Sequence, residues 1–415
     1  MNPGLYSLGI GDRFGHEGKA QMEAINKAAE QGIAITPVWN KSNREHSITG
    51  TMPLQVRAEA DEAVRTSGYR GPYFVDADHI GADTVTKYLE HCDWFTIDVA
   101  SSIGAACTEQ SATMFLKEAH RYIGDLKIDG IARPYIITPS YLDHIASNYL
   151  AATKKAADIY RVIEASKGAG NFVTEISMDE VSVPQRPADI FFILMMLSME
   201  NVPVQTIAPK FSGSFHKGVD YMGDISLFSA EFESDLLVID RAIRDFSLPE
   251  ELKISVHSGS DKFSIYPHIG NIIRKHGKGI HIKTAGTTWL EEVIGLALGG
   301  GDSLAFIRHL CIEALKRREE LSAPYAGVTD IDASLLPDAA TIEEWTGTRL
   351  AGSLRHNSNN ADYNPSFRQL IHLAYKIAAE NRVEFEGYLN QHHTTVSGCV
   401  CENLYDRHIK SIFNL

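Results

Sequence analysis

The sequence lacks long apolar runs and is poor in cysteine. Its longest apolar run, residues 190–199, has about half of the roughly 20 residues that cross a bilayer. Residues 1–4 show neither the basic nor the apolar part of a signal peptide. The 5 cysteines are scattered, and Cys399 and Cys401 have no second pair with which to bind a metal. Because free thiols are typical of a reducing compartment, we expect a soluble, cytoplasmic protein that does not enter a membrane.

Basic charge and nucleotide-binding motifs are also missing. The chain has 39 Lys and Arg against 53 Asp and Glu, a formal net charge of −14. A nucleic-acid partner needs a basic face and is therefore excluded. The Gly9-Ile10-Gly11 segment lacks the third glycine of a dinucleotide fingerprint, and no phosphate-binding GxxxxGK[ST] motif occurs. An anionic substrate would have to meet a local basic pocket.

What the sequence does contain is a repeat of short β-rich runs, each followed by a helical segment. Eight such units in order predict a (β/α)8 TIM barrel, an α/β fold. We expect the barrel over residues 1–300, with a small insertion near 104–140, and a helical C-terminal extension over 301–415 that caps the barrel. The expected strands are residues 6–10, 33–39, 73–75, 94–99, 172–178, 204–208, 253–256 and 279–283.

Charged side chains gather where these strands end. Barrel enzymes build their sites at this rim, and charged groups are costly to desolvate there unless they ligate, pair or react. A barrel without a function at this end would not need them. The residues are Asp12, Arg13, Asp76, Asp78, His79, Asp98, Asp179, Glu180, Lys210, His257, Asp261, Lys262, His281 and Lys283.

Three of the strand ends carry a histidine, namely His79, His257 and His281. Three imidazoles suit one divalent cation (Zn, Mn, Co or Ni) and leave coordination positions open for substrate oxygens. We therefore predict a metal site with these ligands. One condition applies: Asp78 and His79 are successive, so both reach the mouth only if the regular strand has already ended there.

Other strand-end residues are candidates for substrate contact. The loop with Ser258, Asp261 and Lys262 offers backbone N–H groups and a cation for a carboxylate or phosphate, although Ser260 or Asp261 could instead cap the next helix. Arg13, with Asp12 beside it, and Lys283 are further candidates, and ordinary rim ion pairs are the alternative for each. If these cations gather at the mouth, an anionic ligand would neutralise them.

Several of these segments resemble the tagaturonate epimerase family, whose members are metal-dependent and interconvert tagaturonate and fructuronate at C4. The resemblance implies that Asp78 is the proton acceptor, that Glu180 is the proton donor, and that the same three histidines hold the metal. The chain departs from the family in lacking an N-terminal extension, and residues 40–53 and the C-terminal region diverge. The resembling segments are 9–15 (GIGDRFG), 76–79 (DADH), 95–98 (FTID), 177–180 (SMDE), 217–224 (KGVDYMGD), 255–267 (SVHSGSDKFSIYP), 281–287 (HIKTAGT) and 368–372 (RQLIH).

The C4 proton of a 2-ketose acid is not acidic, so we favour retro-aldol cleavage and re-closure of the C3–C4 bond with the metal as Lewis acid. Transient oxidation by a nicotinamide has no support in the sequence. Two other functions stay open: a metal-dependent isomerase or aldolase of a related ketose, with or without a phosphate, and a non-catalytic sugar-acid-binding protein. A homo-oligomer is compatible with the sequence.

Overall fold

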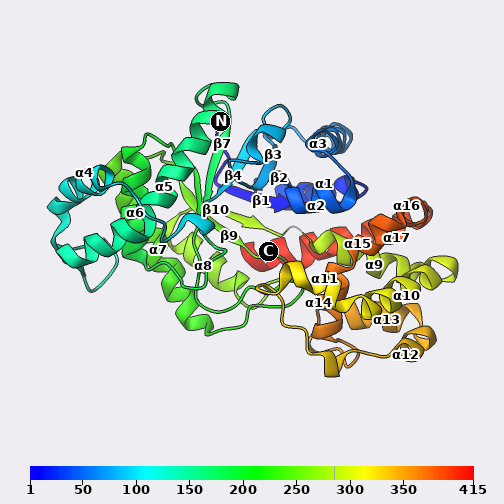
Figure 1. Cartoon of the computed structure of the whole chain (residues 1–415). Helices are drawn as coiled ribbons and strands as arrows, with labels where there is room; N and C mark the ends of the chain where they lie inside the picture. The colour runs from blue at the N-terminus through cyan, green and yellow to red at the C-terminus, as the bar shows by residue number, and fades with distance from the viewer. Residues whose placement is uncertain (285) are drawn as a thin grey trace.

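The computed structural model describes residues 1–284 and 286–415, and it confirms the predicted barrel; residue 285, in the family-like segment 281–287, lies outside the described residues. Eight parallel strands close on themselves in the order β1-β10-β9-β8-β7-β4-β3-β2 (Figure 1). The strands are β1 (Tyr6–Ile10), β2 (Ile35–Ser42), β3 (Phe74–Ile80), β4 (Trp94–Asp98), β7 (Val173–Ser177), β8 (Thr206–Ala208), β9 (Lys253–His257) and β10 (Ile280–Lys283).

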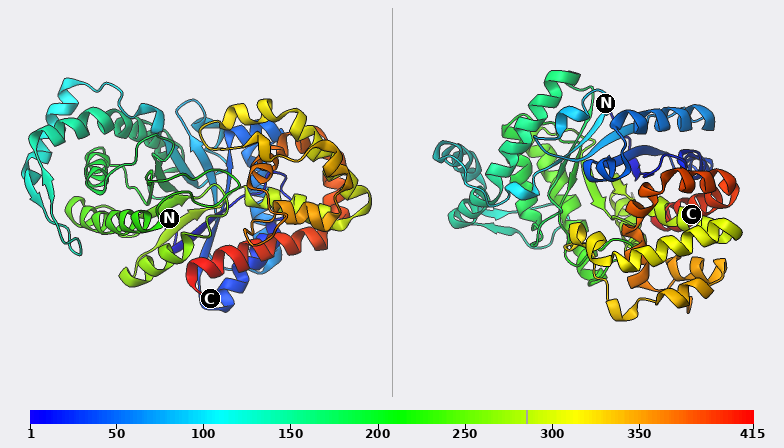
Figure 2. Two further views of the ribbon diagram at one scale, coloured as in Figure 1. Left: turned by 90° about the horizontal axis from the view of Figure 1, so that it is seen from below. Right: turned by 45° about the vertical axis from the view of Figure 1, so that its right-hand side comes forward.

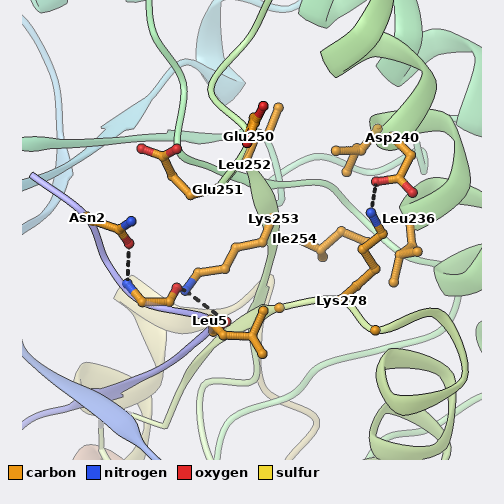
Figure 3. A pocket seen from close by; sticks show the side chains of 14 residues that line it. Asn2, Leu5, Leu236, Asp240, Glu250, Glu251, Leu252, Lys253, Ile254 and Lys278 are labelled. Carbon is orange, nitrogen blue, oxygen red and sulfur yellow. Dashed lines mark hydrogen bonds and ion pairs between the residues drawn. The ribbon is translucent and has the colours of Figure 1, made fainter.

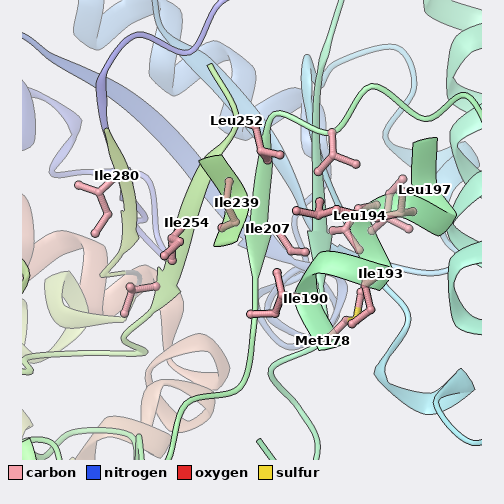
Figure 4. Packing of buried hydrophobic residues seen from close by; sticks show 14 of the residues in the cluster. Met178, Ile190, Ile193, Leu194, Leu197, Ile207, Ile239, Leu252, Ile254 and Ile280 are labelled. Atoms are coloured by element: carbon pink, nitrogen blue, oxygen red, sulfur yellow. The ribbon is translucent and has the colours of Figure 1, made fainter. Parts of the chain in front are cut away.

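Helices surround the barrel. The 13 residues of α6 are buried on nearly every side, as its apolar sequence predicts, and they pack with α5, α7 and the core that contains Ile207 of β8 (Figure 4). The helical segment expected after each strand is reduced after β3 to the short 3-10 turn η1 (Val85–Lys87), because the few residues between β3 and β4 leave no room for a full barrel helix. The helices are α1 (Gly18–Glu30), α2 (Asn43–Thr49), α3 (Pro53–Ser67), α5 (Pro139–Lys167), α6 (Pro187–Met199), α7 (Ile225–Phe246), α8 (Tyr266–His276) and α9 (Thr287–Gly299).

An insertion follows β4 and projects on the left of Figure 1. It contains α4 (Glu109–Ala119) and an antiparallel hairpin of β5 (Gly124–Leu126) and β6 (Tyr135–Ile137). The insertion predicted near residues 104–140 is thus present and contains this hairpin. No helix in the described ranges combines the length and the apolar character that a membrane crossing needs.

The C-terminal region is helical and contacts the barrel in two ways. Its first part packs with α9 around a second buried cluster that contains Trp289, Leu370 and Phe385. Its helices are α10 (Gly301–Lys316), α11 (Arg318–Ser322), α12 (Ala339–Glu344), α13 (Gly347–Leu354), α14 (Pro365–Leu373), α15 (Tyr375–Glu380), α16 (Arg382–Gln391) and α17 (His393–Glu402).

The last residues return to the barrel wall. The π-helix Asn403–Ile409 and α18 (Lys410–Phe413) contact α1 and α8, and the last helices run beside α1 in the left view of Figure 2. Leu404, Ile409 and Ile412 belong to the barrel's core cluster, whereas α9 belongs to the second cluster. The chain's end therefore occupies the place beside α1 and α8 where the helix after the last strand would ordinarily pack.

The barrel interior changes from apolar to charged along its axis. Val38, Phe74, Trp94 and Val173 form a small apolar cluster inside the barrel. Toward the carboxyl ends of the strands, the inward side chains become acidic or basic, beginning with Asp76 on β3, which pairs in register with Trp94 on β4. This arrangement places the charged groups at the end where barrel enzymes act.

Candidate active site at the carboxyl ends of the strands

Two of the three predicted histidine ligands meet at the mouth of the barrel, together with one carboxylate. Each of His79, Asp179 and His257 offers one ligand atom, and these atoms all lie within 4.8 Å of one another. The rings of His79 and His257 have centroids 5.0 Å apart. Two imidazoles and a carboxylate are a donor set that suits a divalent transition metal.

Backbone irregularity brings His79 to this point. The pairing of β3 with β4 shifts register between Ala77 and Ile80, and His79 has a φ of 51°, in the left-handed region that non-glycine residues rarely adopt. The bulge turns His79 toward the same side as Asp78, and His79 Nε2 lies 3.9 Å from Asp78 Oδ1. We had expected Asp78 and His79 both to reach the mouth only if the strand ended before them. The strand instead continues to Ile80, and the bulge brings both side chains to the mouth.

Hydrogen bonds orient both imidazoles. His257 Nε2 lies 2.7 Å from Glu175 Oε1, and His79 Nδ1 lies 3.4 Å from Asp98 Oδ2. His257 Nδ1 is buried 3.2 Å from Asp179 Oδ1, but without the geometry of a hydrogen bond. A proton on His257 Nε2 would leave the Nδ1 lone pair directed toward His79 and Asp179, as metal ligands require. The residues present therefore fit a divalent cation.

Below this group lies a buried ionic network centred on Lys283. Its Nζ is 2.8 Å from both Asp76 Oδ2 and Asp78 Oδ1, and 3.2 Å from Glu175 Oε1. Thr96 Oγ1 lies 2.6 Å from the same nitrogen. Lys283 is only 4% exposed, so it neutralises carboxylates of the protein. Substrate contact by Lys283 stays a prediction.

The network separates the pKa values of its carboxyl groups. Burial would raise the pKa of Asp78, but Lys283, followed by His79 and His257, outweighs burial and lowers that pKa to about 2. Burial raises the pKa of Asp76 to about 7, against the opposing effect of Lys283. Burial lowers the pKa of His79, but Asp78, Asp98 and Asp179 outweigh this effect and raise it to about 10. The mouth of the barrel thus favours added positive charge, which is a second reason why a cation fits.

His281, the third predicted metal ligand, lies deeper in the barrel. It precedes Lys283 by two residues on β10, its Nδ1 is 2.9 Å from Ser7 Oγ, and its ring packs 4.6 Å from that of Trp94. It is not part of the group whose ligand atoms approach one another. Burial lowers its pKa to about 3, so the ring is neutral. Its assignment as a metal ligand stays a prediction.

The two predicted proton-transfer residues occupy different environments. Asp78 is 7% exposed and is held ionised by Lys283. Glu180 is exposed and directly follows Asp179 in the loop after β7. The two carboxylates therefore differ in depth, with Asp78 inside the barrel and Glu180 at its rim.

The remaining predicted substrate contacts are engaged within the protein. Arg13 Nε bonds Glu45 Oε1 at 3.0 Å, and the Asp12 carboxylate accepts backbone N–H groups of residues 14, 16 and 17. Lys262 donates to His216 O, Val219 O and Ser260 Oγ, and Ser258 Oγ donates to Lys283 O. Arg13, Lys262 and Lys283 each have partners inside the protein, and substrate contact by these residues stays a prediction.

Asp261 is fully buried and pairs with Arg368 of α14, whose NH2 is 2.7 Å from Asp261 Oδ2. His356 and His408 each have a ring nitrogen 3.4 Å from an Asp261 oxygen. Neither Ser260 nor Asp261 caps α8, because that helix begins at Tyr266 after Ile265. Asp261 thus connects the loop after β9 with the C-terminal region.

Sequence reasoning missed the roles of Asp179, Glu175 and Asp76. Asp179 was recognised as a strand-end carboxylate but not as a partner of the histidines. Glu175 is a fully buried acid and the one charged residue of strand β7, and a charge within a barrel strand is a signal that could have been used.

A cavity at the other end of the barrel is separate from this site (Figure 3). It lies at the amino ends of β9 and β10, where Lys253 Nζ donates to Gly4 O and Leu5 O and Lys278 pairs with Asp240. Barrel enzymes act at the carboxyl ends, so the group around His79 and His257 is the candidate active site.

Fold and site together define a (β/α)8-barrel protein with an imidazole–carboxylate group at the carboxyl ends of its strands. The model of one family, described as "UxaE: tagaturonate epimerase", matches residues 2–411. The chain belongs to the tagaturonate epimerase family.

Two relatives show the extent of this similarity. A tagaturonate/fructuronate epimerase of Thermotoga maritima is 30% identical over 299 residues, which are 69% of this chain but only 58% of the relative. A glycerol-complexed crystal structure of the fructuronate-tagaturonate epimerase UxaE from Cohnella laeviribosi is 25% identical, with a TM-score of 0.82 over 99% of this chain and 82% of that chain. A probable tagatose 6 phosphate kinase from Sinorhizobium meliloti, 12% identical with a TM-score of 0.53, shares the fold alone.

Proposed function

We propose that this protein is a cytoplasmic, divalent-metal-dependent epimerase that interconverts tagaturonate and fructuronate by inverting C4. Family membership over residues 2–411 and the printed activities of the two relatives support the substrate. The observation that carries the proposal is the approach of His79, Asp179 and His257 beside the ionised Asp78, at the end of the barrel where enzymes of this fold act.

His79, Asp179 and His257 would hold the metal, with Glu175 and Asp98 orienting the two imidazoles. A divalent cation bound there supplies a Lewis acid for the oxygens at C2 and C3 of the ketose. Glycerol in the Cohnella laeviribosi structures is a polyol, as the substrate is.

The carboxylates would move the protons. Asp78, kept ionised by Lys283, accepts the proton of the C4 hydroxyl while the C3–C4 bond breaks and C4 becomes an aldehyde. The aldehyde group then turns over, the C3–C4 bond forms again on its other face, and Glu180 returns a proton to the C4 oxygen. In the reverse direction the two carboxylates exchange these roles.

We expect activity to depend on a divalent metal. Dialysis against a chelator should abolish turnover, and Mn, Co, Ni or Zn salts should restore it, because the C2 carbonyl is otherwise not polarised. The measurement is the epimerisation rate before dialysis, after dialysis, and after each metal is added. Full activity of metal-free protein would reject this part of the proposal.

Two neighbouring residues provide the control for the ligand set. Asp179→Asn should lose bound metal, whereas Glu180→Gln should retain it, as measured by elemental analysis after gel filtration. His281→Gln should also retain the metal, since His281 lies outside the ligand group. Metal loss in His281→Gln would restore the three-histidine set that the sequence predicts.

The substrate is tested by comparing a uronate ketose with related sugars. We expect fructuronate and tagaturonate to be interconverted with a much higher kcat/KM than fructose, tagatose or their 6-phosphates. Chromatography of the equilibrium mixtures would identify the products. A preference for a phosphorylated ketose, or production of an aldose or of three-carbon fragments, would support the isomerase or aldolase alternative instead, and binding without turnover would support a sugar-acid-binding protein.

A further inference from the structure

We propose that Arg44 and Lys217, which both lie beside the ring of Tyr325, bind the carboxylate of the sugar acid. This inference rests on the proposed function for the identity of the ligand. Both residues follow carboxyl ends of barrel strands, Arg44 in α2 after β2 and Lys217 in the segment after β8. They therefore lie at the same end of the barrel as His79 and His257.

The two cations converge on one aromatic ring. The guanidinium carbon of Arg44 lies 4.9 Å from the centroid of Tyr325, and Lys217 Nζ lies 5.8 Å from the same centroid. A cation over an aromatic face is attracted by the ring and keeps its N–H groups available at its outer side. Both charges therefore lie beside one ring, where their positive potentials add and attract a carboxylate.

The cations have no anionic partner in the protein. Within residues 1–284 and 286–415, neither the Arg44 nor the Lys217 side chain makes an ion pair or hydrogen bond, although the chain has a net charge of −14. Arg44 is exposed and Lys217 is half-buried, so both are accessible to a ligand. The other cations near the mouth, by contrast, have partners inside the protein. Arg13 pairs with Glu45, Lys262 donates to two backbone carbonyls and a hydroxyl, and Lys283 pairs with three carboxylates.

The ring that carries these cations is held rigidly. Tyr325 is 6% exposed, and its hydroxyl lies 2.8 Å from that of Tyr375, which is fully buried. The Arg13 guanidinium packs 4.0 Å from the centroid of the Tyr375 ring. Because Tyr325 is held in place before a ligand binds, part of the entropy cost of ordering the long side chains of Arg44 and Lys217 is avoided.

A series of contacts connects Tyr325 and its two cations with the candidate active site around His79 and Asp78. Arg13 packs on Tyr375 and pairs with Glu45, which neighbours Arg44 in α2. Ser42, two residues before Arg44, pairs in register with Asp78 of β3, and its backbone N–H donates to Glu45 Oε2 at 3.1 Å. A ketose with C2 and C3 at His79 and Asp179 would therefore extend its C6 carboxylate toward Arg44 and Lys217.

The test measures binding apart from turnover. Calorimetric titration of the holoenzyme with fructuronate should show about 10- to 100-fold weaker binding for Lys217→Met and for Arg44→Met, the usual range for losing one charge-assisted hydrogen bond. Binding of the neutral sugar fructose should be unchanged in both variants. Lys87→Met is the matched control, because Lys87 is an exposed cation beside α2 that bonds Asn43 and touches neither tyrosine.

The outcomes separate this inference from the proposed function. If the wild type epimerises fructuronate but both variants bind it as tightly as the wild type, the carboxylate site is rejected and the function stands. If the wild type binds fructuronate through Lys217 and Arg44 without epimerising it, the carboxylate site stands and the function is rejected. Equal weakening for fructose, or no binding of fructuronate to the wild type, also overturns the carboxylate site.

Discussion

Replacing Asp78 by Asn or Glu180 by Gln is expected to lower the turnover number by about 10²- to 10⁴-fold, the usual contribution of a positioned proton-transfer group. In Asp78→Asn the amide cannot accept the C4 hydroxyl proton, although it still fits beside Lys283. In Glu180→Gln the loop after β7 loses its acid but keeps Asp179. KM for fructuronate and metal content should change little in both variants.

The pH dependence gives a further measurement on the same residues. Asp78 is ionised in the folded protein because its pKa lies at about 2, below the ordinary value of 3.8. Its contribution to stability is therefore complete above pH 3.8 and is lost only as the pH falls through about 2. Asp78 cannot cause a fall in rate between neutral and mildly acidic pH. A near-wild-type rate in Asp78→Asn or Glu180→Gln would show that the replaced carboxylate does not transfer a proton.

The second large effect is expected in stability rather than in rate. Replacing Arg368 by Leu should lower the free energy of unfolding by about 3–5 kcal/mol, because it leaves the Asp261 carboxylate buried without its charged partner. Arg368 also donates its Nε–H to Gly218 O at 2.7 Å, so two segments near the site lose an anchor. Urea unfolding of the purified variant would measure the loss.

A control and a pH series distinguish this effect from a general weakening of the C-terminal region. Arg349→Leu removes an exposed ion pair with Asp362 and should cost at most about 1 kcal/mol. Burial raises the pKa of Asp261, but Arg368 and then His356 and His408 outweigh this and hold it well below its ordinary value. The stability that ionised Asp261 contributes to the wild type is therefore complete above that ordinary value and is lost as the pH falls below it, so the difference between wild type and Arg368→Leu should shrink in acid. A loss no larger than that of Arg349→Leu would contradict the prediction.

Much of the fold could be predicted because eight apolar strands recur in order, and a strand in a parallel barrel is apolar on both faces. The boundaries of β3 could not, since the bulge between Ala77 and Ile80 depends on pairing with β4 and leaves no sign in the sequence. That bulge decides which way His79 points.

The depth of each side chain along the barrel axis was the second property that the sequence did not predict. His281 and Lys283 face the same way because side chains alternate along a strand, but the step of two residues from one to the other places His281 about 7 Å further from the mouth. A position near a strand end therefore indicated the correct end of the barrel without indicating the layer. Asp179, just beyond β7, reaches the histidines that His281 does not approach in the structure.

The cations available to an anionic substrate also differ between the sequence-based prediction and the structure. From the sequence, Arg13, Lys262 and Lys283 were to provide the positive charge, but each has partners inside the protein. The side chains of Arg44 and Lys217 lack ion-pair and hydrogen-bond partners among the described residues, and no feature of the sequence connects Arg44 in α2 with Lys217 in the family-like segment 217–224. Their pairing on Tyr325 joins residues that are more than a hundred positions apart, which only the folded chain reveals.

The place of the C-terminal segment beside α1 and α8 has a consequence for how the protein is made. Strands β1 and β10 pair with each other, yet the wall outside this seam is completed by residues 403–413, including the contact of Phe413 with Tyr6. A nascent chain that has all eight strands still exposes the apolar surface that these last residues cover. Contacts between such distant parts of a sequence form slowly, and exposed apolar surface promotes aggregation in the meantime. The apolar surface beside α1 and α8 is therefore covered only after residues 403–413 have left the ribosome.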